Sequence, residues 1–528
     1  MGPLINDIWN KPWHTSVAAG VLLGLSFPPL NFPFLQFIAF ILLFRLAESS
    51  RSGRELSLYA WPAFLVWNLF GTYWLLMATV AAGLAAITAN ALLMLLPLLL
   101  IRNYQLLNMN RWITALLAAS TWTGYEFLHH HWELAWPWLS LANGWATMTG
   151  IIQYISWTGH LAVTFWVVFT SFLFYSYFTT RKRQYLAGTI SLLLLAPLLS
   201  LLADASWQEN PDPEPFEAAV VQHNIDSYRH LGGFGSADEI ITLLLNQTRE
   251  VITDETRLVI WPENAVNTSL SLDSPRIHRI RDSLRSWNTE LITGTGFVEY
   301  YEDSGQEPAI VRRMADGRGY NVFNASLHIT PHGQTPDVYK KGKLVPVVER
   351  LPYANFLKKL DIMNWVDWGL VTRYGRGDLA NPFHVSGELT GGMVCYDSVF
   401  PYWVGNFVRN GATFLTIVTN DGWWGDSSGH TQHFEYARLR AIEYRRWVVR
   451  SANNGISGII SPDGEVLVET EYWTQAAFRH TIWPDERLTF YARYGNWFNF
   501  LMLLAAGAGV LLVLSRRKWQ QRKVKTGY

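Results

Sequence analysis

The sequence holds three reactive side chains at or near the ends of apolar runs. Glu263 follows the run Leu258–Pro262, Cys395 follows Gly391–Val394, and Lys341 lies between them in a lysine-rich segment. A carboxyl group beside a buried run has a raised pKa, which suits it to act as a general base. A cysteine at a strand-to-turn junction can act as a nucleophile, and an inward-facing lysine can stabilise an oxyanion.

Each of these residues also has a simpler explanation when it is taken alone. Glu263 could end a surface turn, and Cys395 could be a small, inert core residue. Lys341 and Lys343 share one face of an extended chain, so they could belong to a solvated edge strand. The cysteine is the most informative of the three, because a free thiol in an oxidising compartment favours a use for it.

The elements that would hold these residues are short β-strands interleaved with helices. The strands are predicted at 218–224, 257–262, 291–298, 321–329, 392–395, 413–420, 448–452 and 457–460. A helix is predicted over 433–447, and Ser461–Gly464 is typical of a hairpin turn. This alternation predicts one α/β domain, in which functional side chains follow the strand ends.

The charge of the chain is distributed unevenly. The whole sequence has 42 Lys and Arg against 42 Asp and Glu, so it lacks the basic excess of a nucleic-acid-binding protein. Residues 1–203 hold 14 charged side chains, about 7% of the positions, whereas the other 325 residues hold 70, about 22%. One cysteine excludes an intramolecular disulfide and any cysteine-based metal cluster. The first part is therefore expected in a bilayer and most of the second in water.

Apolar stretches predict seven membrane spans before the soluble domain and an eighth after it. Residues 56–101 carry no charge and are long enough for two spans of about 20 residues each. The other stretches lie at 15–29, 33–47, 112–128, 160–178, 185–203 and 497–514, with prolines forming a tight hairpin between the first two. The predicted division is a membrane domain over 1–203, a soluble domain over 204–496 that starts with a Pro-rich linker (204–216), a final span over 497–514 and a basic tail over 515–528.

The distribution of basic residues predicts how the chain is oriented. If the N-terminus is cytoplasmic, the loops on that side and the tail hold nearly all the basic residues of the membrane part, such as Arg45, Arg102, Arg181 and Arg516. The loops on the opposite side, at about 29–33, 81–84 and 129–159, hold no Lys or Arg. Residues 204–496 are therefore expected outside, which in a bacterium means the periplasmic side of the inner membrane.

The loop over 129–159 is rich in tryptophan and has two interpretations. It could form an aromatic belt at the membrane interface, or an amphipathic arm that lines a lipid access route. In the second case Trp136 and Trp138 would contact substrate. The three consecutive residues His129–His131 point in different directions on a helix, so we expect no metal site there.

Five stretches, in this order, resemble the bacterial apolipoprotein N-acyltransferase family, a membrane-embedded branch of the nitrilase (carbon–nitrogen hydrolase) superfamily. They are WPENA (261–265), YKKGKLVPVVERLP (339–352), Cys395-Tyr396, NDGWWG (420–425), and a stretch over 432–455 in which Gln432-His433, Ala437–Ala441 and Arg450–Gly455 recur. The resemblance covers nearly the whole chain, because this family also has seven spans, a periplasmic nitrilase-like domain and a final span. It implies an αββα sandwich over 204–496 and a catalytic triad of Glu263, Lys341 and Cys395.

The resemblance implies a two-step acyl transfer through a thioester on Cys395. Glu263 takes the thiol proton and the thiolate attacks an ester of a membrane phospholipid, while Lys341 and the N–H of Tyr396 stabilise the oxyanion. The α-amino group of the N-terminal diacylglyceryl-cysteine of an apolipoprotein then takes the acyl chain. Glu349 is expected to orient Lys341 or to share the work of the base. No cofactor and no metal are implied.

The sequence departs from the family pattern at three positions. Val348 stands where the family usually has Gly, and Trp424 stands where it usually has Phe. Asp397 replaces the glutamate two residues after the nucleophile, which keeps the charge on a shorter side chain and leaves its supporting role open. Trp423 and Trp424 could form a mobile loop over the site or an anchor at the membrane interface.

Two other functions stay open from the sequence. A membrane-anchored amidase with the same triad would hydrolyse its intermediate with water, but it would need one anchor at most. A transporter or scaffold with an inactive domain would have charged residues facing the interior of the helix bundle. Glu126 is the main candidate for such a residue.

Overall fold

The chain forms two compact units in a computed structural model, which describes residues 11–207, 214–266, 268–301, 308, 311–333, 335–360 and 374–526. Unit 1 comprises Met1–Trp132, Trp136–Gln208 and Tyr494–Tyr528. Unit 2 comprises Glu133–Ala135 and Glu209–Arg493. Part of the predicted linker, residues 208–213, lies outside the described residues.

Unit 1 is entirely helical among its described residues. Its longer helices are α2 (Pro12–Leu25), α3 (Leu35–Ser49), α4 (Gly53–Thr72), α6 (Val80–Leu93), α7 (Leu95–Leu106), α8 (Arg111–His129), α11 (Leu161–Thr180), α12 (Arg183–Ser206) and α19 (Trp497–Thr526). Short helices complete it: α5 (Leu75–Ala78), η1 (Leu141–Trp145), α9 (Thr149–Ile152) and α10 (Ile155–Thr158). Each predicted apolar stretch falls on one of these helices, and the stretch over 56–101 is divided between α4 and the α6–α7 pair.

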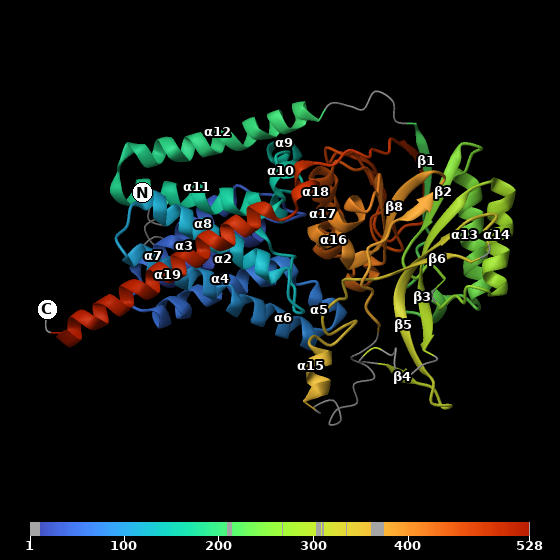
Figure 1. Cartoon of the computed structure of the whole chain (residues 1–528), viewed down its shortest axis with the longest axis horizontal. Helices are drawn as coiled ribbons and strands as arrows, with labels where there is room; N and C mark the ends of the chain where they lie inside the picture. Colours follow the sequence, from blue (N-terminus) through green and yellow to red (C-terminus); the bar gives the residue numbers. More distant parts are fainter. Residues whose placement is uncertain are drawn as a thin grey trace. The chain divides into compact units, whose positions relative to one another are not determined.

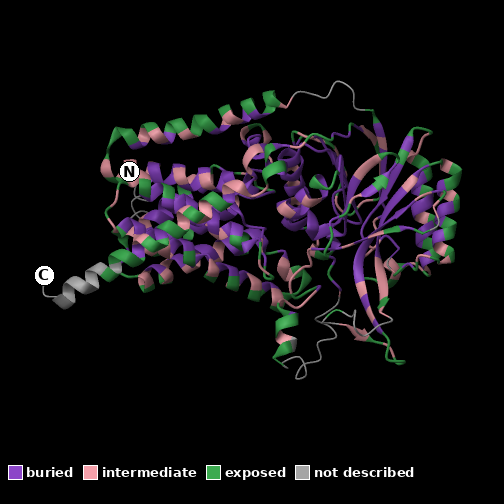
Figure 2. Cartoon of the chain, viewed as in Figure 1, coloured by how far each residue is buried: buried purple, intermediate pink, exposed green. Residues whose placement is uncertain are grey.

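Four helical segments of unit 1 are long and apolar enough to cross a membrane, within the part of the chain that the structure describes. They are Val80–Leu106, Leu161–Thr180, Arg183–Ser206 and Trp497–Arg516. The outward face of α12 is apolar, with Leu194, Leu198 and Leu201 more than half exposed (Figure 2). Large exposed apolar faces of this kind are unfavourable in water. The total of eight spans stays a prediction.

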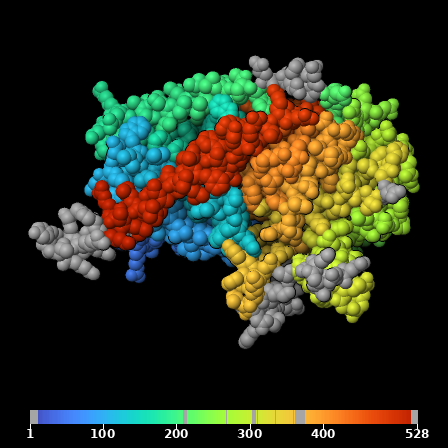
Figure 3. Space-filling view, viewed as in Figure 1, coloured from blue at the N-terminus to red at the C-terminus, as the bar shows by residue number. Residues whose placement is uncertain are grey.

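The last helix of unit 1 is longer than the predicted span. α19 lies on one face of the unit and continues past Leu514 (Figure 3). The predicted basic tail therefore begins as a continuation of this helix. Most of the tail's side chains lie outside the described residues.

The buried carboxylate of unit 1 has a structural explanation. Glu126 accepts hydrogen bonds from Trp122 Nε1 (3.0 Å), Leu141 N (3.1 Å) and Thr164 Oγ1 (2.7 Å). It thereby joins α8 to η1 and to α11, so its burial needs no transport pathway. The rings of His129, His130 and His131 each contact a different group: Asn90, Ser140 and the carbonyl of Phe127.

Unit 2 is built on two β-sheets. The seven-stranded sheet has the order β13-β1-β2-β3-β5-β4, with β6 also paired to β5. Its strands are β1 (Phe216–Gln222), β2 (Thr256–Trp261), β3 (Glu290–Tyr301), β4 (Arg312–Arg313), β5 (Gly319–Ile329), β6 (Asp337–Lys340) and β13 (Ala476–Ile482). The six-stranded sheet has the order β12-β11-β10-β9-β8-β7. Its strands are β7 (Phe383–Val385), β8 (Glu388–Val394), β9 (Phe414–Thr419), β10 (Val448–Ala452), β11 (Gly458–Ile460) and β12 (Val466–Glu469).

The two sheets pack face to face between layers of helices. Ser326 Oγ of β5 donates to the Gly392 carbonyl of β8 at 2.6 Å, and Ser451 Oγ of β10 donates to the Val221 carbonyl of β1 at 2.8 Å. The helices α13 (Ala237–Val251) and α14 (Pro275–Trp287) cover the outer face of the seven-stranded sheet (Figure 1). The helices α16 (Pro401–Arg409) and α17 (Ser428–Tyr444) pack against the other sheet. The predicted αββα sandwich is confirmed for unit 2.

All eight predicted strands are present, with ends that differ by a few residues. The predicted hairpin turn at Ser461–Gly464 joins the antiparallel pair β11 and β12. The helix predicted over 433–447 begins earlier, because Ser427 caps it, and it ends at Tyr444, because Arg445 has a left-handed backbone. The remaining short elements among the described residues are η2 (His230–Gly233), α15 (Ala354–Lys359), η5 (Cys395–Val399), η6 (Asp421–Trp424) and α18 (Phe490–Tyr494).

Candidate functional site

The carboxyl ends of parallel strands bring reactive side chains together between the sheets of unit 2. Glu263 comes two residues after β2, Cys395 directly follows β8, and Asp421 comes two residues after the neighbouring β9. Lys341 directly follows β6, and its N–H donates to the Asn324 carbonyl of β5 at 2.9 Å. All five of these side chains are buried. The structure therefore places the three reactive residues of the sequence in one region.

The glycine at position 294 of β3 allows the backbone of Glu263 to approach this strand closely. Gly294 N donates to the Pro262 carbonyl at 3.1 Å, and Ala265 N donates to the Gly294 carbonyl at 3.1 Å. A Cβ atom at Gly294 would lie 2.4 Å from the Cα of Glu263. A larger residue there would displace the glutamate.

Lys341 lies between two glutamates. Its Nζ is 2.9 Å from Glu349 Oε1 and 3.9 Å from Glu263 Oε1. Asn324 Nδ2 contacts the same two oxygens, at 2.6 Å from Glu263 Oε1 and 3.2 Å from Glu349 Oε1. The other oxygen of Glu349 accepts the N–H of Val345 at 2.7 Å. Glu349 is thus placed to orient the lysine. The sequence interpretation missed Asn324, although a polar residue inside a predicted buried strand was a usable signal.

The charges of this cluster set its protonation states. Burial raises the pKa of Glu263 to about 7; Lys341 opposes this rise and Glu349 adds to it. Burial alone would lower the pKa of Lys341, but Glu349, Cys395 and Glu263 together raise it well above its usual value. Near neutral pH the lysine is therefore a cation. Glu263 can both accept and release a proton there.

Cys395 has an unusual backbone conformation and a neutral thiol. Its φ is 48°, in the left-handed region that non-glycine residues rarely adopt. Burial raises the pKa of the thiol above its usual range; Glu263 adds to the rise and Lys341 opposes it. A reaction at this sulfur therefore needs a base that removes the proton.

Asp397 stands at one of the three positions where the sequence departs from the family pattern. Its Oδ2 accepts from Tyr339 OH (2.8 Å) and from Val394 N (3.1 Å), and its Oδ1 accepts from Gly342 N (3.2 Å) and from Lys343 N (2.7 Å). Burial raises its pKa to about 6, which Lys341 opposes. The short carboxylate thus ties the start of the Cys395 turn to the segment after Lys341.

The prediction that Lys341 and Lys343 share one strand face is wrong. β6 ends at Lys340, and the contacts with Asp397 turn the chain immediately afterwards. Lys341 points at the two glutamates, whereas the ammonium group of Lys343 lies 4.4 Å from the ring centre of Tyr402 and 5.2 Å from that of Trp403. The two lysines have different surroundings for this reason.

A second charged group lies on another side of Cys395. Asp421 accepts from Arg450 Nη2 (2.6 Å) and Thr419 Oγ1 (2.8 Å), and its Oδ1 is 2.9 Å from His433 Nδ1. His433 Nε2 lies 3.3 Å from the Cys395 carbonyl oxygen. Asp421, His433 and Arg450 lie inside the resembling stretches, but the sequence alone assigned them no role.

Comparison with known proteins assigns the family. Residues 217–482 match the carbon–nitrogen hydrolase family, and residues 19–173 match the apolipoprotein N-acyltransferase N-terminal domain. The chain belongs to the carbon–nitrogen hydrolase family.

Three relatives, each named apolipoprotein N-acyltransferase, are similar over nearly their whole length. The protein from Chlorobaculum tepidum is 29% identical and covers 97% of this chain and 98% of its own. The protein from Geobacter metallireducens is 26% identical, and the match covers 98% of this chain and 97% of that protein. The protein from Pseudomonas aeruginosa PAO1 is 26% identical, with 95% of both chains covered. The resemblance predicted from the sequence is confirmed.

The aromatic candidates are divided between the two units. In unit 2, Trp423 is partly exposed and its carbonyl accepts the hydroxyl of Tyr228 at 2.8 Å, while Trp424 packs edge-on against His433. Tyr396 OH donates to the Ala135 carbonyl at 3.0 Å.

The other two aromatic candidates belong to unit 1. Trp138 is buried with its ring edge-on to Trp74 at 4.9 Å, and Trp136 is half-buried. The tight packing of Trp138 gives it a place in the interior of its unit.

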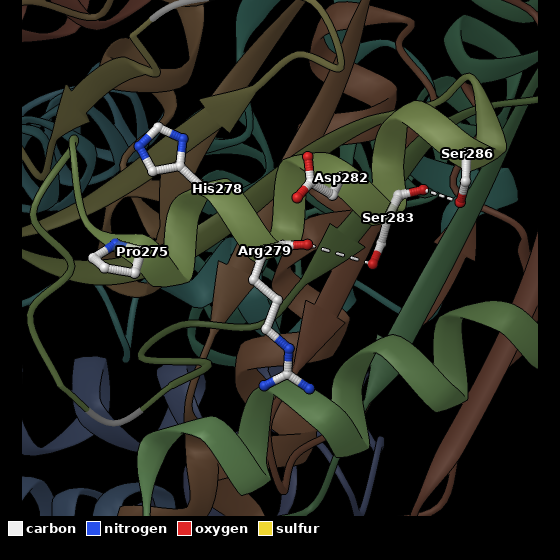
Figure 4. Close-up of a pocket in the computed structure, with 6 residues that line it drawn as sticks. All are labelled: Pro275, His278, Arg279, Asp282, Ser283 and Ser286. Carbon is white, nitrogen blue, oxygen red and sulfur yellow. Dashed lines mark hydrogen bonds between the residues drawn. The ribbon is translucent and has the colours of Figure 1, made fainter.

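A surface depression on α14 is separate from this cluster. Its volume is about 580 Å³, and Pro275, His278, Arg279, Asp282, Ser283 and Ser286 line it from a single helix (Figure 4). Arg279 Nη2 donates to Thr242 Oγ1 of α13 at 2.7 Å. Because α14 covers the outer face of its sheet, the depression does not open on the residues between the sheets.

Proposed function

We propose that this chain is an apolipoprotein N-acyltransferase that takes its acyl chain from a membrane phospholipid. The acceptor is the α-amino group of the N-terminal diacylglyceryl-cysteine of an apolipoprotein. Similarity over almost the full chain to relatives of that name supports the activity. The observation that carries the chemistry is a buried, neutral thiol in the same cluster as a carboxyl group of pKa about 7 and a lysine cation.

The first step forms a thioester. Glu263 takes the proton of Cys395, and the sulfur attacks the ester carbonyl carbon of the phospholipid. Lys341 and the N–H of Tyr396 stabilise the oxyanion that forms. The ester C–O bond then breaks, the protonated Glu263 returns its proton to the departing oxygen, and a lysophospholipid leaves.

The second step forms the amide. The acceptor amine attacks the thioester carbon and gives a proton to Glu263, the C–S bond breaks, and Glu263 returns a proton to the sulfur. Glu349 keeps Lys341 in place through both steps, since it holds the ammonium group at 2.9 Å. Asp397 takes the supporting role of the family's usual glutamate, because it accepts four hydrogen bonds at the turn. Trp423 and Trp424 contribute to substrate contact.

The membrane part has a direct use in this reaction, because both substrates are anchored in lipid. We assign residues 1–203 to a membrane domain of about seven spans, 204–496 to a periplasmic catalytic domain, 497–514 to a last span and 515–528 to a cytoplasmic tail. The exposed apolar face of α12 supports the bilayer context. A soluble amidase would not need such a unit, so hydrolysis of a soluble amide is not favoured.

Intact-protein mass spectrometry tests the first step. The full-length protein in detergent is mixed with a diacyl phospholipid and no acceptor. We expect a mass gain of one acyl chain on the wild type, its removal by neutral hydroxylamine, and no gain on Cys395→Ala. Addition of a diacylglyceryl peptide should then discharge the adduct and give an N-acylated product.

A matched control separates chemistry from folding. Glu290→Gln replaces a partly buried glutamate of the same unit that contacts His328 and not Cys395. This variant should form the thioester like the wild type. Release of free fatty acid without amide formation would identify a hydrolase and contradict the proposed function.

A further inference from the structure

The backbone on both sides of Cys395 contacts buried polar groups. The N–H of the preceding residue, Val394, donates to Asp397 at 3.1 Å. The Cys395 carbonyl accepts the hydroxyl of Ser398 at 2.8 Å and lies 3.3 Å from His433 Nε2. A left-handed non-glycine residue persists only where its surroundings hold it. These contacts supply that hold.

The His433 ring is also held through Nδ1, the nitrogen that does not face Cys395. Its Nδ1 lies 2.9 Å from Asp421 Oδ1 and 3.2 Å from Arg450 Nη2, so the ring is fixed between the carboxylate and the guanidinium group. Its Nε2 faces both the Cys395 carbonyl and the Ser398 hydroxyl at 3.3 Å. With a proton on Nε2, the ring donates to the Cys395 carbonyl beside the Ser398 hydroxyl.

Asp421 is held by contacts of its own. Arg450 Nη2 binds its Oδ2 at 2.6 Å, and Arg450 Nε is held by the Ile456 carbonyl at 3.1 Å. A Cβ atom at Gly455 would lie 2.5 Å from the same Oδ2, so the backbone also closes around the carboxylate. All three residues are buried: Asp421 begins η6 just after β9, His433 lies on α17 and Arg450 lies on β10.

We propose that His433, fixed by Asp421 and Arg450, is a positioning residue that holds Cys395 in its left-handed conformation and directs the thiol toward Glu263. The three atoms concerned are close, since the Cys395 sulfur, a nitrogen of His433 and an oxygen of Asp421 lie within 4.8 Å of one another. His433 acts through the backbone of Cys395, whereas Glu263 and Lys341 act on the reacting atoms. This inference rests on the proposed function for its acylation readout only.

The test compares His433→Ala with His433→Gln in the full-length protein. The glutamine amide can donate or accept near the position of Nε2, whereas alanine leaves the Cys395 carbonyl with Ser398 alone. We expect His433→Ala to lower the maximal rate of thioester formation about 10- to 100-fold, because a small misplacement of a reacting group costs that much. The phospholipid concentration for half-maximal rate should stay within about twofold. His433→Gln should recover most of the rate.

A second readout needs no phospholipid. Cys395 is the only cysteine, so the mass gain with iodoacetamide reports on this thiol alone. Its alkylation rate, followed from pH 6 to 10, should change its pH profile in His433→Ala and return toward the wild-type profile in His433→Gln. If wild-type protein forms no thioester, the proposed function fails, while alkylation still tests the role of His433.

The control is His328→Ala, which removes another buried histidine of unit 2, one that contacts Glu290 at 2.6 Å. It should lower thermal stability without changing the alkylation profile or the thioester rate. The proposal is overturned if His433→Ala behaves like the wild type in both readouts. It is also overturned if His328→Ala and His433→Ala lose rate equally, because that result would indicate general destabilisation.

Discussion

Among the buried carboxyl groups near Cys395, Glu263 and Asp421 have pKa values that shift in opposite directions. Burial raises the pKa of Glu263 to about 7. Burial acts in the same direction on Asp421, but Arg450 and His433 more than compensate, and its pKa falls well below the usual range. The two groups lie at the ends of strands that belong to different sheets of the same sandwich.

The two pKa shifts differ because Glu263 shares its cation with another carboxylate, whereas Asp421, among the described residues, does not share Arg450 in this way. Glu263 shares one cation, Lys341, with Glu349, and the closer of the two contacts goes to Glu349. Asp421 has the guanidinium group of Arg450 at 2.6 Å and two further hydrogen-bond partners. Burial therefore does not decide the role of a carboxylate. Glu263 is able to exchange a proton near neutral pH, whereas Asp421 stays charged and holds structure.

The largest expected effect is on the rate of thioester formation, when Glu263, the carboxyl group that exchanges a proton, is replaced. Glu263→Gln keeps the shape of the side chain but cannot accept a proton, so thioester formation should fall about 10²- to 10⁴-fold in single-turnover acylation. The yield of folded protein should match that of Glu290→Gln. A loss of less than about fivefold would show that Glu263 is not the base.

Removal of the cation that binds Asp421 should lower the stability of the fold. Arg450→Met leaves the charge of Asp421 buried without its cation, so we expect a loss of about 3–5 kcal/mol in the free energy of unfolding, measured by denaturant titration. Arg479→Met, which breaks the half-exposed contact with Glu217, should change it by less than about 1 kcal/mol. Equal losses in the two variants would contradict the pairing of Asp421 with Arg450.

The two carboxyl groups should also differ in their pH dependence. Thioester formation should rise about tenfold per pH unit below about pH 7 and then level off, because Glu263 must be ionised to act. Its raised pKa favours the folded state at low pH, and that contribution is lost as the pH rises from 4.5 to about 7. The lowered pKa of Asp421 has the opposite sign, because its contribution is present above 3.8 and lost as the pH falls. Rate and stability measured from pH 3 to 9, with Asp421→Asn as the comparison, check both signs.

The smallest expected effect on stability comes from removing the neutral hydroxyl that donates to Asp421. Thr419→Val removes one hydrogen bond to a carboxylate that keeps Arg450 and His433, so a loss of about 1.5 kcal/mol is expected. Thr242→Val on the exposed surface of α13 should change stability by less than about 0.5 kcal/mol. A loss as large as that of Arg450→Met would mean that the hydroxyl, not the guanidinium group, stabilises the charge.

The fold of unit 2 was predictable where strands are long and buried. β9 and β10 are buried at every position, and their apolar and β-branched residues predicted them directly. The sequence interpretation missed β6, β7 and β12, which have three or four residues each and are partly exposed, so their patterns are too short to stand out. β13 is half-exposed along its length and was missed for the same reason.

The sequence by itself determined the division into an apolar and a charged part, the α/β class of unit 2, and three reactive residues at or near strand ends. These properties follow from composition and local periodicity, which need no knowledge of distant contacts. Only the tertiary structure decided that Asn324 joins Glu263 to Glu349, that Asp397 turns Lys343 away from Lys341, and that His433 meets the backbone of Cys395. A pKa and a backbone conformation depend on charges and donors within a few ångströms, and here segments up to 158 positions away in the chain, counting from Glu263 to Asp421, supply them.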